Sequence, residues 1–128
     1  MNKGIRIWNK AIKIIPGGNG LLSKRPHRYL PNIWPTYYKK SKGLNIWDLN
    51  NKKYIDFCQM GIGTCILGYA NKFVDGAVKK AVNSGVNSSL NSIEEYILAK
   101  KILKYNKFAD QIKFARGGGE AMSIAVRL

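Results

Sequence analysis

The sequence predicts an α/β fold in which a helical arm and a β-hairpin are followed by two helices, a strand and a final helix. Three observations predict it. Apolar residues recur at helical spacing near the start, and β-branched and aromatic runs flank an Asn-Asn pair in the first half. Near the end, three consecutive glycines join a short apolar run to a helical one. The hydrophobic content of 45% is too high for a disordered tail.

The first segment is predicted to be an amphipathic helix. Its apolar residues recur at offsets of three, four and three; they are Ile5, Trp8, Ile12 and Ile15. The run Pro16-Gly17-Gly18 is expected to stop this helix, because proline cannot continue the hydrogen-bond ladder and glycine accepts positive φ. Residues 19–35 contain several prolines and no clear period, so we expect an extended loop.

A β-hairpin is predicted next. Residues 34–40 and 44–47 have the composition of short strands, and Asn50-Asn51 separates residues 46–49 from residues 54–57. Asparagine tolerates the left-handed conformation that tight turns need, which favours an antiparallel pair. The next segment contains three glycines, Gly61, Gly63 and Gly68. Glycine has no side chain, so we expect the backbone to approach other groups closely at these positions.

Two helices are predicted in the second half. Residues 73–83 have small apolar side chains on one face and end at Ser84-Gly85. Ser92 is expected to cap the next helix, whose first turn carries two glutamates and whose last turns carry lysines, as the helix dipole favours. We expect its apolar residues to form a buried face: Ile93, Ile97, Leu98, Ile102 and Leu103.

The segment after these helices is the candidate site. Residues 111–115 are predicted to form a short strand, Gly117-Gly118-Gly119 a turn, and Glu120 the start of a helix. Such a junction presents unpaired backbone N–H groups at the positive end of a helix dipole, where phosphate binds well. The glycine spacing matches neither the Walker A loop nor the dinucleotide-binding fingerprint, which disfavours ATP and NAD.

The charge is strongly unbalanced, with 22 lysines and arginines against 7 acidic residues. Residues 1–47 contain no acidic residue. This pattern suggests a nucleic-acid-binding module as an alternative function, although lysine far outnumbers arginine and solvated lysines explain the charge as well. A scaffold or interaction protein is a further alternative.

Targeting, membrane and metal signals are weak. No apolar stretch approaches the length of a membrane span and none follows the start as a signal peptide would, so we expect a cytoplasmic protein that does not bind membranes. Cys58 and Cys65 are expected to be buried free thiols, because no further cysteine or histidine cluster supports a zinc site or a disulfide framework. No metal site is predicted.

Four motifs in order resemble the N-terminal part of the class III aminotransferases, closest to the glutamate-1-semialdehyde aminomutase branch. The first is Ile14-Ile15-Pro16-Gly17-Gly18, and the second is Gly43 with residues 47–57. Gly61-Ile62-Gly63 with residues 67–71 resembles a third family segment, and residues 113–121 resemble the family's "VxFxNSGTEA". The resemblance implies a fold-type I enzyme that uses pyridoxal 5'-phosphate.

The resemblance also implies site residues. Gly117, Gly118 and Gly119 stand where the family holds the cofactor phosphate through backbone amides, although the family's Ser and Thr hydroxyls are missing. Ile62 stands where the mutases carry a substrate-pocket Trp, and Lys24 or Arg25 matches a basic residue that meets the substrate carboxylate. These assignments predict substrate binding by Lys24, Arg25 and Ile62.

The implied function is transfer of an amino group between an amino donor and a carbonyl acceptor. None of the 17 lysines has a recognisable Schiff-base context, so we assign no catalytic residue and expect an inactive N-terminal fragment of a longer enzyme. Residues 1–57 would form the helix, loop and hairpin arm, and residues 58–128 the start of the cofactor-binding large domain. The resemblance further implies a homodimer with no nucleic-acid partner.

Overall fold

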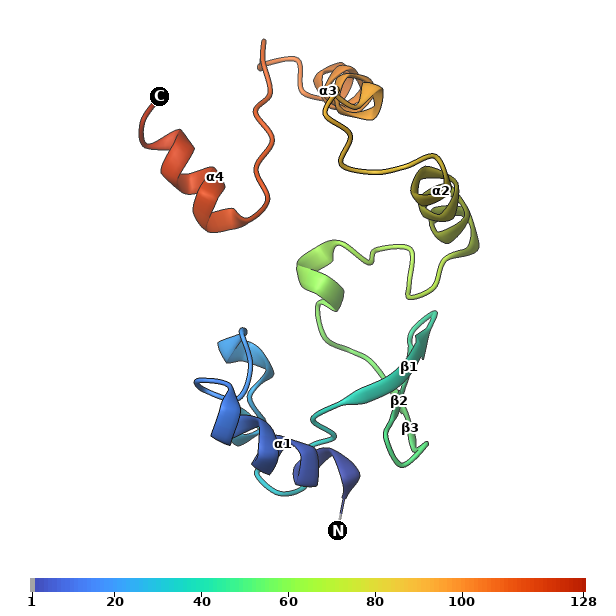
Figure 1. Cartoon of the computed structure of the whole chain (residues 1–128), viewed down its shortest axis with the longest axis vertical. Coiled ribbons are helices and arrows are strands. Elements are labelled where there is room, and N and C mark those ends of the chain that lie inside the picture. Colours follow the sequence, from blue (N-terminus) through green and yellow to red (C-terminus); the bar gives the residue numbers. More distant parts are fainter. Residues whose placement is uncertain (1) are drawn as a thin grey trace. The chain divides into compact units, whose positions relative to one another are not determined.

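The computed structural model describes residues 2–128 and divides into two compact units, the first ending at Asn83 and the second spanning Ser84–Leu128 (Figure 1). The first unit contains α1 (Lys3–Ile14), β1 (Tyr38–Lys42), β2 (Asn45–Asp48), β3 (Lys53–Ile55) and α2 (Lys72–Asn83), with three 3-10 turns, Leu22–Lys24, Pro26–Arg28 and Met60–Gly63. The second unit contains α3 (Ile93–Tyr105) and α4 (Gly118–Ala125). The predicted division after residue 57 concerns the domains of a complete enzyme and stays a prediction.

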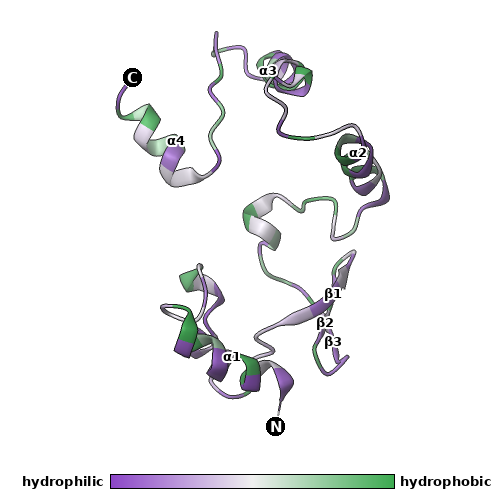
Figure 2. Cartoon of the chain, viewed as in Figure 1, coloured by the Kyte–Doolittle hydropathy of each residue, from purple (hydrophilic) through white to green (hydrophobic). Residues whose placement is uncertain are grey.

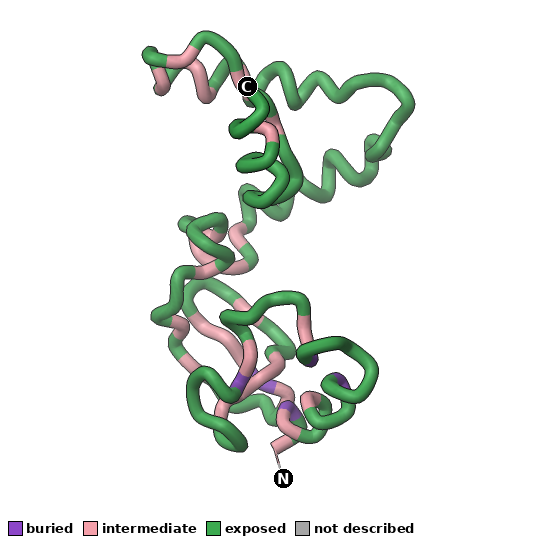
Figure 3. The backbone as a smooth tube through the Cα atoms, turned by 90° about the vertical axis from the view of Figure 1, so that its left-hand side faces the viewer, coloured by how far each residue is buried: buried purple, intermediate pink, exposed green. Residues whose placement is uncertain are grey.

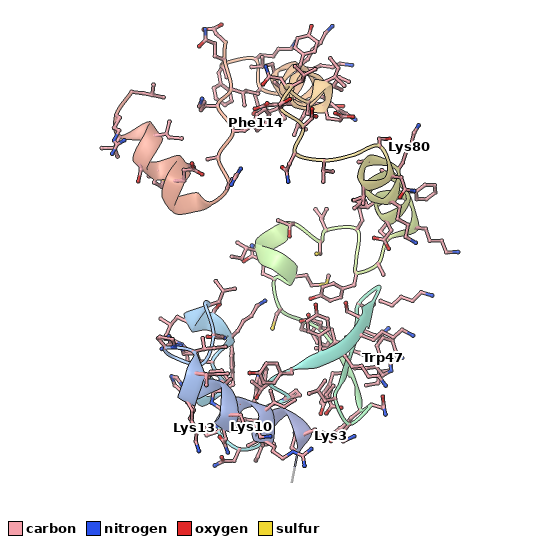
Figure 4. The ribbon with its side chains drawn as sticks, viewed as in Figure 1. Lys3, Lys10, Lys13, Trp47, Lys80 and Phe114 are labelled. Atoms are coloured by element: carbon pink, nitrogen blue, oxygen red, sulfur yellow. The ribbon has the colours of Figure 1, made fainter. Side chains whose placement is uncertain are left out.

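Helix α1 confirms the amphipathic pattern of the N-terminal segment. Figure 2 shows hydrophobic and hydrophilic residues on different sides of it, and Lys10 and Lys13 project from it (Figure 4). Asn2 caps the helix, because its Oδ1 accepts the N–H of Gly4 at 2.8 Å. The same Oδ1 accepts the side-chain amide of Asn50 at 3.1 Å, which ties the start of α1 to the hairpin turn.

Both backbone conformation and side-chain packing require glycine in the Pro-Gly-Gly run that follows α1. Gly17 and Gly18 have φ values of 72° and 79°. A Cβ on Gly17 would lie 2.1 Å from a guanidinium nitrogen of Arg25, and a Cβ on Gly18 would lie 2.4 Å from the ring of Trp8. Glycine is therefore required at both positions by backbone conformation and by the side chains that lie against them.

The three strands form an antiparallel sheet in the order β1-β2-β3, which confirms the hairpin. Asn51 has a φ of 64°, the left-handed conformation predicted for the turn. Strand β1 begins at Tyr38 rather than at residue 34, since Pro35 has no N–H for the ladder. Lys40 and Lys53 are each paired with Trp47 across the sheet, and their ammonium groups lie 5.2 and 5.8 Å from the Trp47 ring centroid.

Asp48 closes the β2–β3 turn and is 5% exposed. Its Oδ1 accepts the backbone N–H groups of Asn50 and Lys52, each at 2.8 Å, and its Oδ2 accepts the Tyr54 hydroxyl at 3.2 Å. Burial acts to raise the pKa of Asp48, but these hydrogen bonds outweigh it and hold the pKa below its ordinary value of 3.8. The carboxylate is thus the ionised acceptor around which the turn is built.

The segment after the hairpin returns to the sheet at Tyr69. The backbones of Gly43 and Tyr69 exchange two hydrogen bonds of 2.8 Å. Gly68 has a φ of 83°, and a Cβ there would lie 3.1 Å from the carbonyl oxygen of Gly43. The close backbone approach predicted for this glycine is confirmed.

In the second unit, the strand predicted for residues 111–115 is wrong. Among the described residues the only sheet is β1-β2-β3, and residues 111–115 have no ladder to join. A strand needs the N–H and C=O groups of a neighbouring strand, which sequence pattern alone does not supply. Helix α4 begins at Gly118 rather than at Glu120, so two of the three glycines lie in its first turn.

Several predicted details of burial and capping are also wrong. Ser92 stands at the N-cap of α3, but its hydroxyl donates to the Glu94 carboxylate instead of accepting a backbone N–H. The apolar face of α3 is at most half-buried: Ile93 is 62% exposed and Ile97 is 54% exposed, while Ile102 and Leu103 are half-buried (Figure 3). Cys58 and Cys65 are free thiols as predicted, but Cys58 is exposed and Cys65 half-buried.

Residues 2–128 form neither a membrane-spanning helix nor a cluster of metal ligands. No helix formed by these residues is long and apolar enough to cross a membrane. Within the same residues, no three side chains of histidine, cysteine, aspartate or glutamate are grouped so as to hold a metal ion.

Replacing Asp48 by alanine should destabilise the first unit by about 1–3 kcal/mol, because two part-buried backbone hydrogen bonds and the bond from Tyr54 lose their acceptor. Urea unfolding followed by tryptophan fluorescence measures this, since all three tryptophans lie in the first unit. The matched control is Asp110→Ala, which removes an exposed carboxylate from the second unit. Equal unfolding midpoints for the two variants would contradict the role given to Asp48.

The stability supplied by Asp48 should depend on pH. Because its pKa is lower in the folded chain than in the unfolded chain, the contribution is complete above the ordinary value of 3.8 and is lost as the pH falls through the folded value. Acid titration of the free energy of unfolding from about pH 6 to about pH 2 should show this loss. The Asp48→Ala variant should lack this pH-dependent contribution to the free energy of unfolding. Identical acid profiles in the parent and the variant would contradict the role given to Asp48.

Candidate functional site

The glycine triplet lies at the N-terminus of α4. Gly117 is the N-cap, with extended backbone at φ −155° and ψ 161°, and it provides no side-chain cap. The first intrahelical bond runs from the N–H of Ala121 to the carbonyl of Gly117 at 3.0 Å. The N–H groups of Gly118, Gly119 and Glu120 therefore have no intrahelical acceptor and stand at the positive end of the helix dipole.

The space around the triplet is open. A Cβ on any of the three glycines would meet no atom within 4 Å, and none of the three has a positive φ. The Glu120 carboxylate accepts the N–H of Arg116 at 2.8 Å, which fixes the chain on its way into the helix. The N-terminus of α4 thus offers an oxyanion up to three backbone donors, and the three glycines add no side chain of their own there.

Lys24 and Arg25 lie in the loop after α1, in the first unit. Lys24 ends the first 3-10 turn and is exposed. Arg25 is half-buried, with its guanidinium against Gly17 and its Nε buried without a hydrogen-bond partner. The structure therefore orients Arg25 and leaves Lys24 in solvent.

Ile62 lies in the 3-10 turn Met60–Gly63 of the first unit. It is 79% exposed and has left-handed backbone, with φ 56° and ψ 47°. A β-branched residue in this conformation is strained, by on the order of 1 kcal/mol or more. No hydrogen bond joins Ile62 to Lys24 or Arg25, and the glycine triplet belongs to the other unit.

Asp56 and Tyr69 form a polar pair that sequence analysis missed. The Tyr69 hydroxyl donates to Asp56 Oδ2 at 2.7 Å, and Asp56 Oδ1 accepts the N–H of Cys58 at 2.8 Å. Burial and the neighbouring carboxylate raise the pKa of the Tyr69 phenol far above its usual range. No periodicity or motif spacing indicates this pair, because its two members lie 13 positions apart in the sequence.

Comparisons with known proteins point to one family. The family model described as Aminotransferase class-III matches residues 28–128. The chain belongs to the class III aminotransferase family. The match covers the whole segment from the second 3-10 turn to the end of the sequence, including the hairpin and the glycine triplet.

Relatives of this class III aminotransferase chain include two glutamate-1-semialdehyde 2,1-aminomutases. The protein from Nitrosopumilus maritimus is 34% identical over 96% of the chain, and that from Campylobacter hominis is 37% identical over 94%. The chain spans 28% and 26% of their lengths, respectively. They are similar to the chain over nearly all of its residues, while most of each relative lies outside the matched part.

Solved structures support the fold. The FumI protein of Sphingopyxis sp. MTA144, in its PLP internal aldimine form, superposes with a TM-score of 0.82 at 27% identity and covers 94% of the chain. An omega-transaminase from Sphaerobacter thermophilus gives a TM-score of 0.83 at 22% identity over 98% of the chain. The chain covers 28% and 27% of the lengths of those two proteins. The superpositions confirm the predicted fold class, the N-terminal part of a fold-type I enzyme.

Ile62→Gly should cost less stability than Ile66→Gly. Both side chains are largely exposed, at 79% and 87%, but only Ile62 has a positive φ. Glycine relieves strain at residue 62 and only adds backbone entropy at residue 66, so the two free energies of unfolding should differ by about 1 kcal/mol. Urea unfolding monitored by tryptophan fluorescence provides the comparison, and equal losses would mean that Ile62 is unstrained.

Proposed function

We propose that the protein carrying this chain binds pyridoxal 5'-phosphate and transfers an amino group between an amino donor and a carbonyl acceptor, as an aminotransferase or aminomutase. Membership of the class III family and the PLP-containing structures that it resembles support the proposal. The observation that carries it within this chain is the N-terminus of α4, where three backbone N–H groups are free and no Cβ obstructs them.

In this proposal the chain's own residues bind and orient. The backbone amides of Gly117, Gly118 and Gly119 hold the cofactor phosphate, and the N–H of Glu120 adjoins them. Because the family's two hydroxyls are missing, the free energy of phosphate binding is less favourable by about 1 kcal/mol for each lost hydrogen bond. When bound, the cofactor supplies the electron sink for amino transfer.

The proposed substrate contacts come from the first unit. Lys24 and Arg25 supply positive charge for a substrate carboxylate, and Ile62 supplies an aliphatic surface. No lysine of residues 2–128 is proposed as the Schiff-base residue. The homodimer and the cytoplasmic location stay predictions, and the comparisons give the nucleic-acid-binding alternative no support.

The activity is tested with the purified protein that carries this chain, rather than with residues 1–128 alone. The assay contains added pyridoxal phosphate, a panel of amino donors and a panel of 2-oxo acids and aldehydes. Uptake of the cofactor is followed by absorbance and amino transfer by chromatography of the products. Protein that takes up no cofactor and moves no amino group to any acceptor would refute the proposal.

The role of the triplet is tested by Gly119→Thr and Gly119→Asp in the same protein. The threonine hydroxyl should tighten cofactor binding about fivefold, which corresponds to one added neutral hydrogen bond. The aspartate should weaken it more than tenfold by repelling the phosphate, while its charge favours the helix dipole and preserves α4. Absorbance titration measures affinity, and circular dichroism checks the helix. Unchanged affinity in both variants would place the phosphate elsewhere.

A further inference from the structure

The segment Gln59–Cys65 contains two consecutive residues in left-handed conformation. Gly61 has φ 56° and ψ 32°, and Ile62 has φ 56° and ψ 47°. Glycine adopts this conformation freely, whereas isoleucine adopts it only when its surroundings enforce it. The side chain of Ile62 is 79% exposed, so apolar packing does not enforce it.

Hydrogen bonds within the segment enforce the conformation. The carbonyl oxygen of Gly61 accepts two bonds from Thr64, one from its hydroxyl at 2.7 Å and one from its backbone N–H at 3.2 Å. The N–H of Ile62 donates to the carbonyl of Gln59 at 3.1 Å. A Cβ on Gly61 would lie 2.4 Å from Thr64 Oγ1, so the hydroxyl occupies the place of a side chain.

The segment is also anchored beyond its ends. Before it, Asp56 is held to the sheet by its N–H, which donates to the carbonyl of Leu44 at 2.8 Å. After the segment, the backbone of Tyr69 pairs with that of Gly43, and the Tyr69 hydroxyl donates a hydrogen bond to the Asp56 carboxylate. Both ends of the turn that carries Ile62 are therefore fixed. Within the turn, the Thr64 hydroxyl makes the side-chain hydrogen bond that constrains the backbone conformation.

We propose that Thr64 is a positioning residue, whose hydroxyl holds Ile62 in the left-handed conformation so that its aliphatic side chain meets an apolar part of the amino donor or carbonyl acceptor. The substrate half of this inference rests on the function proposed above. The positioning half does not, because it concerns only the geometry of residues 59–65.

The positioning half is tested by NMR of the full chain labelled at isoleucine. In the parent protein, Ile62 should show the chemical shifts and the strong intraresidue HN–Hα contact of positive φ. Thr64→Val keeps the shape but removes the hydroxyl, and should shift Ile62 away from that signature, whereas Thr64→Ser should retain it. Thr36→Val is the matched control, because the Thr36 hydroxyl donates to the Trp34 carbonyl at 3.2 Å elsewhere in the same unit. Retention of positive φ at Ile62 in Thr64→Val would overturn the proposal.

The substrate half is tested by kinetics of the same variants in active protein. Thr64→Val should raise KM for the substrate about fivefold with little change in kcat, and Thr64→Ser should restore it. Ile62→Ala should raise KM similarly, and the double variant should be no worse than the single ones, because both act through one side chain. Additive effects, or an unchanged KM despite a shifted Ile62 signal, would refute the substrate contact. If the protein binds no cofactor and transfers no amino group, the proposed function fails, and the NMR result still decides the positioning.

Discussion

The first unit depends on one buried carboxylate. In the part of the chain that the structure describes, Asp48 is the only charged side chain classed as buried, and it accepts three hydrogen bonds that close the β2–β3 turn. The turn fixes the strand register and places Asn50, whose side chain bonds to Asn2 at the start of α1. A single acceptor thus determines how the hairpin closes and where the first helix is tethered. An ionised group serves this role well, because hydrogen bonds to a charged acceptor are stronger than those to a neutral one.

Directional polar bonds are prominent among the contacts within this unit. Ala11 and Pro26 are the apolar side chains that are buried among the described residues, while Phe57 and Phe73 are about nine-tenths exposed. Half-buried apolar side chains such as Trp8 and Trp47 accompany these bonds within the unit. Besides the Asn2–Asn50 bond, two pairs bring distant residues together and flank the turn that contains Ile62: Gly43 with Tyr69, and Tyr69 with Asp56. They place the turn containing Ile62 beside the sheet, which is why a strained residue can be held at an exposed position.

Sequence pattern predicted the features that are local. The period of α1, the Asn51 turn and the end of α2 each follow from residues within a few positions of one another, and each is confirmed. The glycine triplet was predicted to meet a helix N-terminus for the same reason. Features that depend on distant partners were not predictable in this way. The strand at residues 111–115 lacks a neighbour, and the conformation of Ile62 depends on a threonine hydroxyl whose role no periodicity indicates.

Three of the 22 lysines and arginines lie over aromatic rings of the first unit. Lys40 and Lys53 lie over Trp47, Lys52 lies 5.3 Å from the centroid of Tyr54, and exposed lysines of this kind contribute solvation and cation–π contact. Arg25 differs from them, because its Nε is buried without a partner and its guanidinium lies against Gly17, where a side chain would collide with it. Burying an unpaired donor costs free energy, so the loop must hold Arg25 in this position by packing. Of the two cations predicted to meet a substrate carboxylate, Arg25 is therefore the one whose direction the fold determines.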